Sequence, residues 1–180
     1  MDIIRPTRVS RFHEVHAHDW SKAVWNWKIV YQDNLCMFYC DLDKIVGTAA
    51  DEEGLYAGTE CYMPLPERFA VFTSLAFKTN AKKKRYMEER REKGLSIAGY
   101  ENLQYSLCLA EFDRENERYR IIPVTDYDEN DHELGDSSVF GQSGTRLLKG
   151  VACEWAKIRS RETHPMIMAL YALFFPSLKH

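Results

Sequence analysis

Apolar and polar residues alternate in two stretches of the chain, and the first of them lies near the N-terminus. Its first run, residues 24–31, places four bulky side chains on one face with a period of two: Trp25, Trp27, Ile29 and Tyr31. The polar residues 32–34 favour a turn, and residues 35–42 form a second run typical of a strand. The pattern predicts an antiparallel hairpin over about residues 24–42, with residues 9–17 as a candidate flanking strand.

The second alternating stretch covers residues 103–124. Its apolar positions recur at every second residue on either side of a polar turn at 113–116. Pro123 cannot donate a hydrogen bond to a neighbouring strand, so it predicts the end of the returning strand. The residues that follow, 125–138, are rich in Asp and Glu and predict an acidic surface loop.

Helical signals occur between and after the two hairpins. A long helix is predicted from Pro66, which suits the first turn of a helix, to Lys93, which Gly94 follows. Apolar residues recur at helical spacing over residues 147–158 and predict a second helix. A third predicted helix, residues 165–175, is apolar on every side. This composition favours either a central place in the core or contact with a second copy of the chain, as in a homodimer.

The order of these elements predicts an α+β fold. We expect an antiparallel sheet built from two hairpins (about 24–42 and 103–124), packed with a long central helix (about 66–93) and two C-terminal helices. A chain of 180 residues fits one globular domain, here 1–180, and can bury most of its unfolded surface. Apolar residues make up 45% and aromatic residues 13% of the chain, which excludes intrinsic disorder because their burial offsets the entropy of ordering.

Charge and cysteine content narrow the class of protein. The formal net charge of −3 argues against a broadly basic nucleic-acid binder and leaves room only for a local basic patch. Five cysteines occur without any C-x-x-C spacing, as is typical of free thiols in a reducing compartment. The N-terminus lacks the apolar stretch of a signal peptide, and the longest apolar run is about half of what a membrane-spanning helix needs. We therefore expect a cytoplasmic protein without a membrane partner.

Three of the six histidines fall within six positions, at His13, His16 and His18. If this segment is a strand, His16 and His18 project from one face roughly 6.8 Å apart and could share a divalent metal. Asp19 or Glu14 would add an oxygen ligand or a general base. The spacing is not that of a zincin, because His13 and His16 are one residue short of H-E-x-x-H. The segment therefore predicts a metal site, an exposed edge strand with structural or surface histidines, or a pH-sensitive interface. No other cofactor is expected.

The end of the predicted long helix carries an excess of positive charge. Residues 81–93 contain seven basic and three acidic residues, a local excess of four. The candidate partner contacts are six of these seven basic side chains: Lys82, Lys83, Lys84, Arg85, Arg90 and Arg91. One interpretation is a solvated helix end steadied by pairs such as Lys84 with Glu88. The other is a basic patch that contacts an acidic protein surface or the phosphates of a nucleic acid.

No motif has the spacing that a known catalytic chemistry demands. Whether the protein is an enzyme therefore stays open, and the sequence favours a protein without catalytic activity. The hypothesis we prefer is a non-catalytic interaction or regulatory module that binds a macromolecular partner, in the first place a protein, through the charged helix and the acidic loop. A second hypothesis is a nucleic-acid-binding protein that uses the basic helix 82–93. A third is a small metal-dependent hydrolase or nuclease that uses the histidine cluster.

Overall fold

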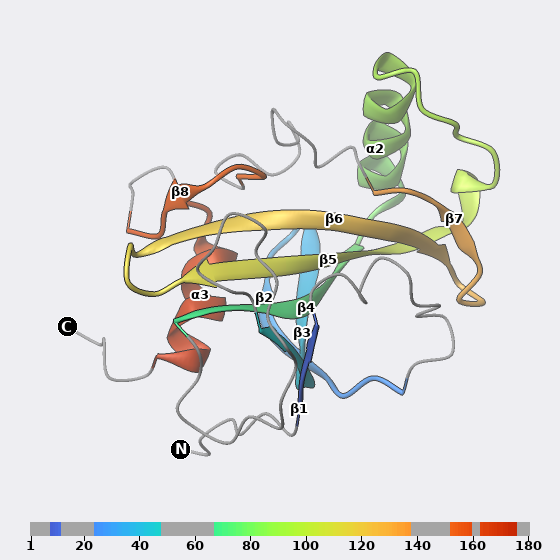
Figure 1. Cartoon of the computed structure of the whole chain (residues 1–180). Helices are drawn as coiled ribbons and strands as arrows, with labels where there is room; N and C mark the ends of the chain where they lie inside the picture. Colours follow the sequence, from blue (N-terminus) through green and yellow to red (C-terminus); the bar gives the residue numbers. More distant parts are fainter. Residues whose placement is uncertain (1–7, 12–23, 48–66, 138–151, 160–162, 176–180) are drawn as a thin grey trace.

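The computed structural model describes residues 8–11, 24–47, 67–137, 152–159 and 163–175 (Figure 1). They form eight strands, two α-helices and one 3-10 helix, η2. In chain order, with the labels of Figure 1, these are β1 (Arg8–Arg11), β2 (Trp27–Gln32), β3 (Cys36–Gly47), β4 (Arg68–Phe77), α2 (Asn80–Glu92), η2 (Tyr100–Asn102), β5 (Leu103–Asp113), β6 (Arg118–Asp128), β7 (Glu133–Gly135), β8 (Ala156–Lys157) and α3 (Pro165–Phe174).

All eight strands belong to one sheet, in the order β1-β3-β4-β5-β6-β7. β2 also pairs with β3, and β8 also pairs with β6, so each of these two long strands carries two short strands along its outer edge. Within the described residues, β1 runs parallel to β3 and every other pairing is antiparallel. The predicted α+β class with an antiparallel sheet is therefore confirmed.

The predicted long helix is wrong over residues 68–77. These residues form the central strand β4, which lies between β3 and β5. Both faces of β4 are covered, so nearly all its side chains are buried and its sequence keeps no apolar–polar alternation. The chain becomes helical only after Thr79, whose hydroxyl accepts a hydrogen bond from the backbone N–H of Lys82 as an N-cap. The predicted helix over 66–93 is thus wrong in its first half, and α2 occupies its second half.

Two further predictions in the second half of the chain are wrong. β6 does not end at Pro123 but continues to Asp128, because Pro123 lies beside a register shift between β5 and β6, where a missing N–H is tolerated. Residues 152–159 contain the short strand β8 in place of a helix, because their backbone pairs with the start of β6. The acidic stretch 125–138 is consequently not a single loop, since it ends β6 and includes β7.

α3 is the apolar helix predicted near the C-terminus. It begins after His164, whose Nδ1 accepts the backbone N–H of Met166, and Pro165 occupies its first turn. Five of its side chains are buried in the main core: Met166, Ile167, Leu170, Tyr171 and Phe174. Packing within this chain therefore explains the apolar residues on the buried side of α3, and a homodimer contact through the helix stays a prediction. No helix in the described ranges combines the length and the apolar character needed to span a membrane.

The two faces of the sheet carry different apolar clusters. Residues of α2 and α3 join the main core on one face. The other face carries a smaller cluster around Phe72, Leu107 and Leu109, with Trp25 and Trp27 packed against it. None of the described residues in this second cluster comes from a helix: they belong to the strands of the sheet and, for Trp25, to the segment that leads into β2.

Four cysteines of the described segments are free, as predicted: Cys36, Cys40, Cys108 and Cys153. The first three are buried and Cys153 is half-buried. Burial raises the pKa of Cys36 to about 12 and that of Cys153 to about 11, so both thiols stay protonated at neutral pH. These cysteines behave as small apolar side chains of the core.

Candidate functional site

The four predicted metal ligands, His13, His16, His18 and Asp19, lie outside the described residues. Within the described segments, no three or more His, Cys, Asp or Glu side chains are placed to hold a metal ion together. The metal site, and the hydrolase or nuclease hypothesis that depends on it, stay predictions.

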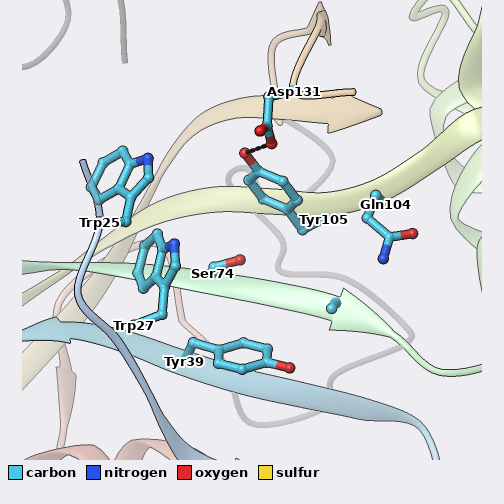
Figure 2. A pocket seen from close by; sticks show the side chains of 8 residues that line it. Trp25, Trp27, Tyr39, Ser74, Gln104, Tyr105 and Asp131 are labelled. Carbon is cyan, nitrogen blue, oxygen red and sulfur yellow. Dashed lines mark hydrogen bonds between the residues drawn. The ribbon is translucent and has the colours of Figure 1, made fainter. Parts of the chain in front are cut away.

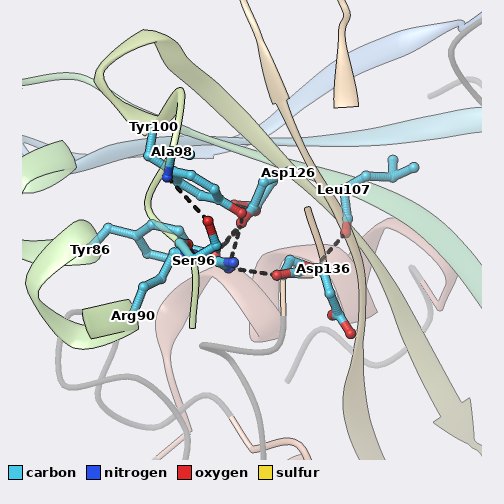
Figure 3. A network of polar contacts seen from close by, with 10 residues as sticks. Tyr86, Arg90, Ser96, Ala98, Tyr100, Leu107, Asp126 and Asp136 are labelled. Atoms are coloured by element: carbon cyan, nitrogen blue, oxygen red, sulfur yellow. Dashed lines mark hydrogen bonds and ion pairs between the residues drawn. The ribbon is translucent and has the colours of Figure 1, made fainter. Parts of the chain in front are cut away.

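The six predicted partner contacts all lie on α2, but they face two directions. Five of them are exposed or half-buried: Lys82, Lys83, Lys84, Arg85 and Arg91. Arg90 is only 3% exposed and points from α2 into the protein (Figure 3). Its charge is therefore engaged inside the fold, and the contact surface that α2 can offer consists of the other five residues.

Arg90 belongs to a buried polar network centred on Asp126 of β6 (Figure 3). Asp126 Oδ2 accepts hydrogen bonds from Arg90 Nη1 at 3.2 Å and from the Tyr100 hydroxyl at 2.8 Å. The Tyr86 hydroxyl lies 3.1 and 3.0 Å from the two carboxylate oxygens, and the Ser106 hydroxyl donates to Oδ1 at 2.6 Å. One carboxylate therefore ties together α2, η2, β5 and β6.

Arg90 makes three further contacts that extend this network to β7. Its Nε donates to the carbonyl oxygen of Ser96 at 2.9 Å, and its Nη1 donates to that of Asp136 at 2.5 Å. Its guanidinium lies over the ring of Tyr100, 4.1 Å from the centroid. Gly135, with a φ of 151°, allows β7 this close approach, since a Cβ at that position would lie 3.3 Å from the Tyr100 hydroxyl oxygen.

Burial governs protonation in this network. Desolvation raises the pKa of Asp126 to about 6, although the surrounding donors favour the charged form. Burial, with the nearby Asp126 charge, also raises the pKa of Tyr86, so this phenol stays protonated and continues to donate. Asp126 is 0% exposed, so a substrate cannot reach it in this conformation. The network is therefore an anchor for α2 and not a reaction site.

Three of the six carboxylates of the acidic stretch 125–138, those of Asp126, Asp128 and Asp131, accept hydrogen bonds within the protein. Asp128 Oδ1 accepts the backbone N–H groups of His132 at 2.9 Å and of Asn130 at 2.7 Å, and these bonds lower the pKa of Asp128. Asp131 has a left-handed φ of 60° and accepts a hydrogen bond from the Tyr105 hydroxyl. The stretch closes the turn between β6 and β7 and brings one carboxylate, that of Asp131, to the second face of the sheet.

A pocket of about 440 Å³ opens on this second face (Figure 2). Four aromatic side chains line it: Trp25, Trp27, Tyr39 and Tyr105. Ser74 and Ala76 of β4 project between them, because alternate residues of a strand share one face. The rings come from β2, β3, β5 and the segment that leads into β2, so the sheet pairing itself brings them together.

The two indole rings are held in place by contacts within the protein. The rings of Trp25 and Trp27 stack, with 4.8 Å between their centroids and 20° between their planes. The ring of Trp25 also meets that of Phe72 edge to face, at 5.3 Å. Asn26 separates the two Trp residues in the sequence, and its backbone N–H donates to Oδ2 of the buried Asp41 at 2.8 Å. This wall of the pocket is therefore pre-organised.

Three polar side chains complete the pocket: Ser74, Gln104 and Asp131. The Tyr105 hydroxyl donates to Asp131 Oδ1 at 2.9 Å, and the Tyr105 ring stacks on Tyr127 at 5.1 Å. Burial raises the pKa of Tyr105, so its hydroxyl stays a donor at neutral pH. Among the described residues that line the pocket, Asp131 has the one carboxyl group and none is Lys, Arg or His, which makes the pocket electronegative.

The sequence pattern identifies the aromatic residues of this pocket but not the pocket itself. A period of two places Trp25 and Trp27 on one face, and the same period is typical of an ordinary core. Asp131 lies 26 residues beyond Tyr105, and only the β6–β7 turn brings the two together. The available signal is the Trp-Asn-Trp sequence itself, which places two large aromatic residues on either side of an exposed Asn26.

Comparisons with protein-family models, with curated proteins and with solved structures found no match to this chain. Neither the sheet nor the pocket is thus assigned by likeness to a known protein. Function is accordingly inferred from the residues and their geometry.

Proposed function

We propose that the protein is a non-catalytic interaction module that binds an acidic protein partner through the exposed side of α2. The observation that carries this proposal is the two-sided construction of the helix. Tyr86 and Arg90 attach one side to Asp126 in the sheet, while Lys84 and Arg85 are exposed on the other side. A helix fixed in this way presents its cations to a partner as a rigid group.

The basic residues are concentrated at the end of the helix where a positive charge is least favourable. The N-terminus of a helix carries the positive end of its dipole, and a cation there is disfavoured by roughly 0.3–1 kcal/mol. The first turn of α2 contains no acidic residue that would compensate Lys82. The cluster Lys82–Arg85 therefore opposes helix stability, and a negatively charged partner would relieve this repulsion.

The small extent of the cluster favours an acidic protein over a nucleic acid. Lys82–Arg85 covers about 4.5 Å of helix axis, whereas tight nucleic-acid binding draws on about 6–10 phosphate contacts along the backbone. The net charge of −3 would also repel a nucleic acid at long range. A short acidic segment of a protein fits a patch of this size.

The acidic stretch 125–138 does not form part of the proposed contact surface. Asp126 is buried in the network that holds α2, and Asp128 closes the turn before β7. The proposed contact surface is therefore α2 alone, whereas the sequence predicted a surface formed by the charged helix and the acidic loop.

Charge reversal on α2 tests the proposal. We expect Lys84→Glu/Arg85→Glu to abolish binding of a short Glu- and Asp-rich peptide, measured by fluorescence anisotropy at about 50 and about 200 mM salt. The matched control is Lys28→Glu/Arg159→Glu, which changes the net charge equally at two exposed positions away from α2. Affinity purification with both variants then identifies partners that the α2 variant loses and the control retains.

Two results would contradict the proposal. If the α2 variant and the control bind the acidic peptide equally, the contact is not on this helix. If a single-stranded RNA or a DNA duplex binds wild-type protein more tightly than the peptide, and the α2 variant loses that binding, the basic helix serves the nucleic-acid hypothesis instead.

A further inference from the structure

The aromatic pocket on the second face of the sheet points to a specific class of ligand. We propose that it binds an organic cation of the quaternary-ammonium type, with the methyl groups of the cation against the aromatic rings and its charge facing Asp131 (Figure 2). No described residue of α2 lines this pocket, so the proposal is independent of the function proposed for that helix.

The charge of the pocket selects a cation. The faces of indole and phenol rings carry negative electrostatic potential and attract a cation within about 6 Å of the ring centroid. Asp131 adds a carboxylate at the edge, and neither Lys nor Arg occurs among the described residues that line the pocket. A phosphate or carboxylate ligand would therefore find repulsion and no counter-ion, whereas a cation is attracted by both the rings and Asp131.

The chemistry of the wall favours a methylated nitrogen over a bare ammonium. A bare ammonium brings three N–H donors, and each of them needs an acceptor once water is removed. Besides the Tyr hydroxyls and the indole N–H groups, the polar side chains among the described residues that line the pocket are Ser74, Gln104 and Asp131, and Asp131 Oδ1 already accepts the Tyr105 hydroxyl. A quaternary nitrogen has no N–H group, and its methyl groups can contact the rings directly.

A sugar is the main rival ligand, because sugars also pack against Trp and Tyr rings. A neutral sugar can donate hydroxyl hydrogen bonds to Asp131, but it has no positive charge for the carboxylate and the ring faces to attract, and it needs several hydrogen-bond partners around its rim. Ser74 is only 6% exposed, which leaves Gln104 and Asp131 as the exposed polar side chains of the pocket. The observations therefore favour the cation, and a disaccharide serves as a competing ligand in the test.

The size of the pocket leaves room for more than the cationic head group. A volume of about 440 Å³ lies within the range of small-molecule sites. Gln104 and Asp131 are exposed, so a chain attached to the head group can leave towards solvent. The same head group occurs on free molecules such as choline and on trimethylated lysine side chains, and the two sources can be separated by experiment.

Calorimetry on the full chain provides the test. The probes are choline, its uncharged isostere 3,3-dimethylbutanol, a short peptide with one trimethyllysine, the same peptide with unmodified lysine, and the disaccharide cellobiose. We expect choline or the trimethyllysine peptide to bind, and the uncharged isostere to bind roughly tenfold more weakly than choline. Tighter binding of the methylated peptide than of choline would assign the ligand to a protein, and the reverse order would assign it to a free molecule.

Two substitutions separate the contributions of ring and charge. Trp27→Ala and Asp131→Asn should each weaken cation binding roughly threefold to thirtyfold. Asn at position 131 retains the shape, can still accept the Tyr105 hydroxyl and tolerates the left-handed backbone. Ile29→Ala is the control, because Ile29 lies on the same strand as Trp27, is 52% exposed and does not line the pocket. If circular dichroism shows that Trp27→Ala is unfolded, Trp27→Leu removes the ring and keeps an apolar side chain.

Three results would overturn the proposal. Equal affinity for choline and its uncharged isostere would mean that the pocket recognises only apolar shape. Tighter binding of cellobiose than of every cation would assign the pocket to sugars. Unchanged cation binding in both Asp131→Asn and the folded Trp27 variant would place the cation elsewhere on the protein.

Discussion

Replacing Asp126 with Asn tests whether a single buried carboxylate holds α2 against the sheet. The side chain keeps its volume, but one charged acceptor oxygen becomes an amide that is itself a donor. This amide would face the hydroxyls of Tyr86, Tyr100 and Ser106, which now donate to the carboxylate. It would also leave the Arg90 guanidinium, 3% exposed, without its counter-ion.

The expected cost follows from two opposing effects. Four side chains donate to the Asp126 carboxylate, and hydrogen bonds to a charged group contribute about 1.5–3 kcal/mol each. Against this, burial disfavours the charged carboxylate so strongly that its pKa is raised to about 6 even with these donors around it, and a neutral Asn does not carry that penalty. The losses exceed the relief, and we expect a net destabilisation of about 3–5 kcal/mol near pH 7, as is typical when one member of a buried ion pair is removed.

The same substitution makes a prediction about pH. Because the pKa of Asp126 is raised on folding, the folded protein binds a proton between about pH 4 and about pH 6 that the unfolded chain does not bind. The contribution of Asp126 to stability is therefore fully present below about pH 4 and is lost as the pH rises through about 6. The difference in unfolding free energy between wild type and Asp126→Asn should accordingly be larger at about pH 5 than at about pH 7.

Urea unfolding followed by circular dichroism at both pH values measures these differences, and amide hydrogen exchange shows where the structure loosens. Exchange should accelerate most in α2, because the network is its principal attachment. Asp136→Asn is the matched control, since its exposed carboxylate lies on the same segment and only its backbone oxygen accepts from Arg90. A loss below about 1 kcal/mol, or a difference that shrinks on acidification, would refute the reasoning.

Three smaller predictions concern single positions. Gly135→Ala should lower the unfolding free energy by about 1–3 kcal/mol, because φ at this position is 151° and the new Cβ would lie 3.3 Å from the Tyr100 hydroxyl oxygen. An unchanged urea midpoint would argue against this close approach. Thr79→Ala should cost about 1 kcal/mol and increase exchange in the first turn of α2, whereas Thr79→Ser should be nearly neutral. Iodoacetamide should label Cys153 before Cys108 in peptide mass mapping, since Cys153 is half-buried and Cys108 is 4% exposed; the opposite order would show that the sheet opens near Cys108.

The parts of the fold that sequence reasoning found are those with a clear local pattern. Alternation around Trp27 and Leu107 locates the strands β2 and β5, because polar residues separate the apolar ones in both sequences. The alternation does not fix the faces, since β5 is buried on both faces from Ser106 onward. The predicted common face of residues 25–31 is also wrong, because the pairing with β3 shifts register after Ile29, which is 52% exposed. β4 defeats the same reasoning, since it is buried on both faces and its run of apolar residues also fits a helix. The apolar helix at the C-terminus was accessible from sequence, because Pro165 and the run that follows are local signals.

Sites built from distant residues could not be found in this way. In the sequence, Arg90 cannot be distinguished from the other cations of the charged helix. Only the fold shows that it is buried against Asp126, 36 residues away. The pocket likewise combines Trp25 and Asp131, which no periodicity relates. The exposed basic residues of α2 could be named from sequence because Lys and Arg side chains are rarely buried.

Short strands form both edges of the sheet, and this arrangement limits aggregation through edge-to-edge strand pairing. A long strand with unpaired N–H and C=O groups is a template on which another chain can add, and this is a common start of aggregation. Here the two long strands near the rims, β3 with 12 residues and β6 with 11, are each shielded by a pair of short ones. β1, β2, β7 and β8 have 4, 6, 3 and 2 residues, so the described rims offer an incoming chain only short stretches of backbone. These short strands therefore protect the long ones from pairing with another molecule, and loss of β8 would expose the start of β6 to such pairing.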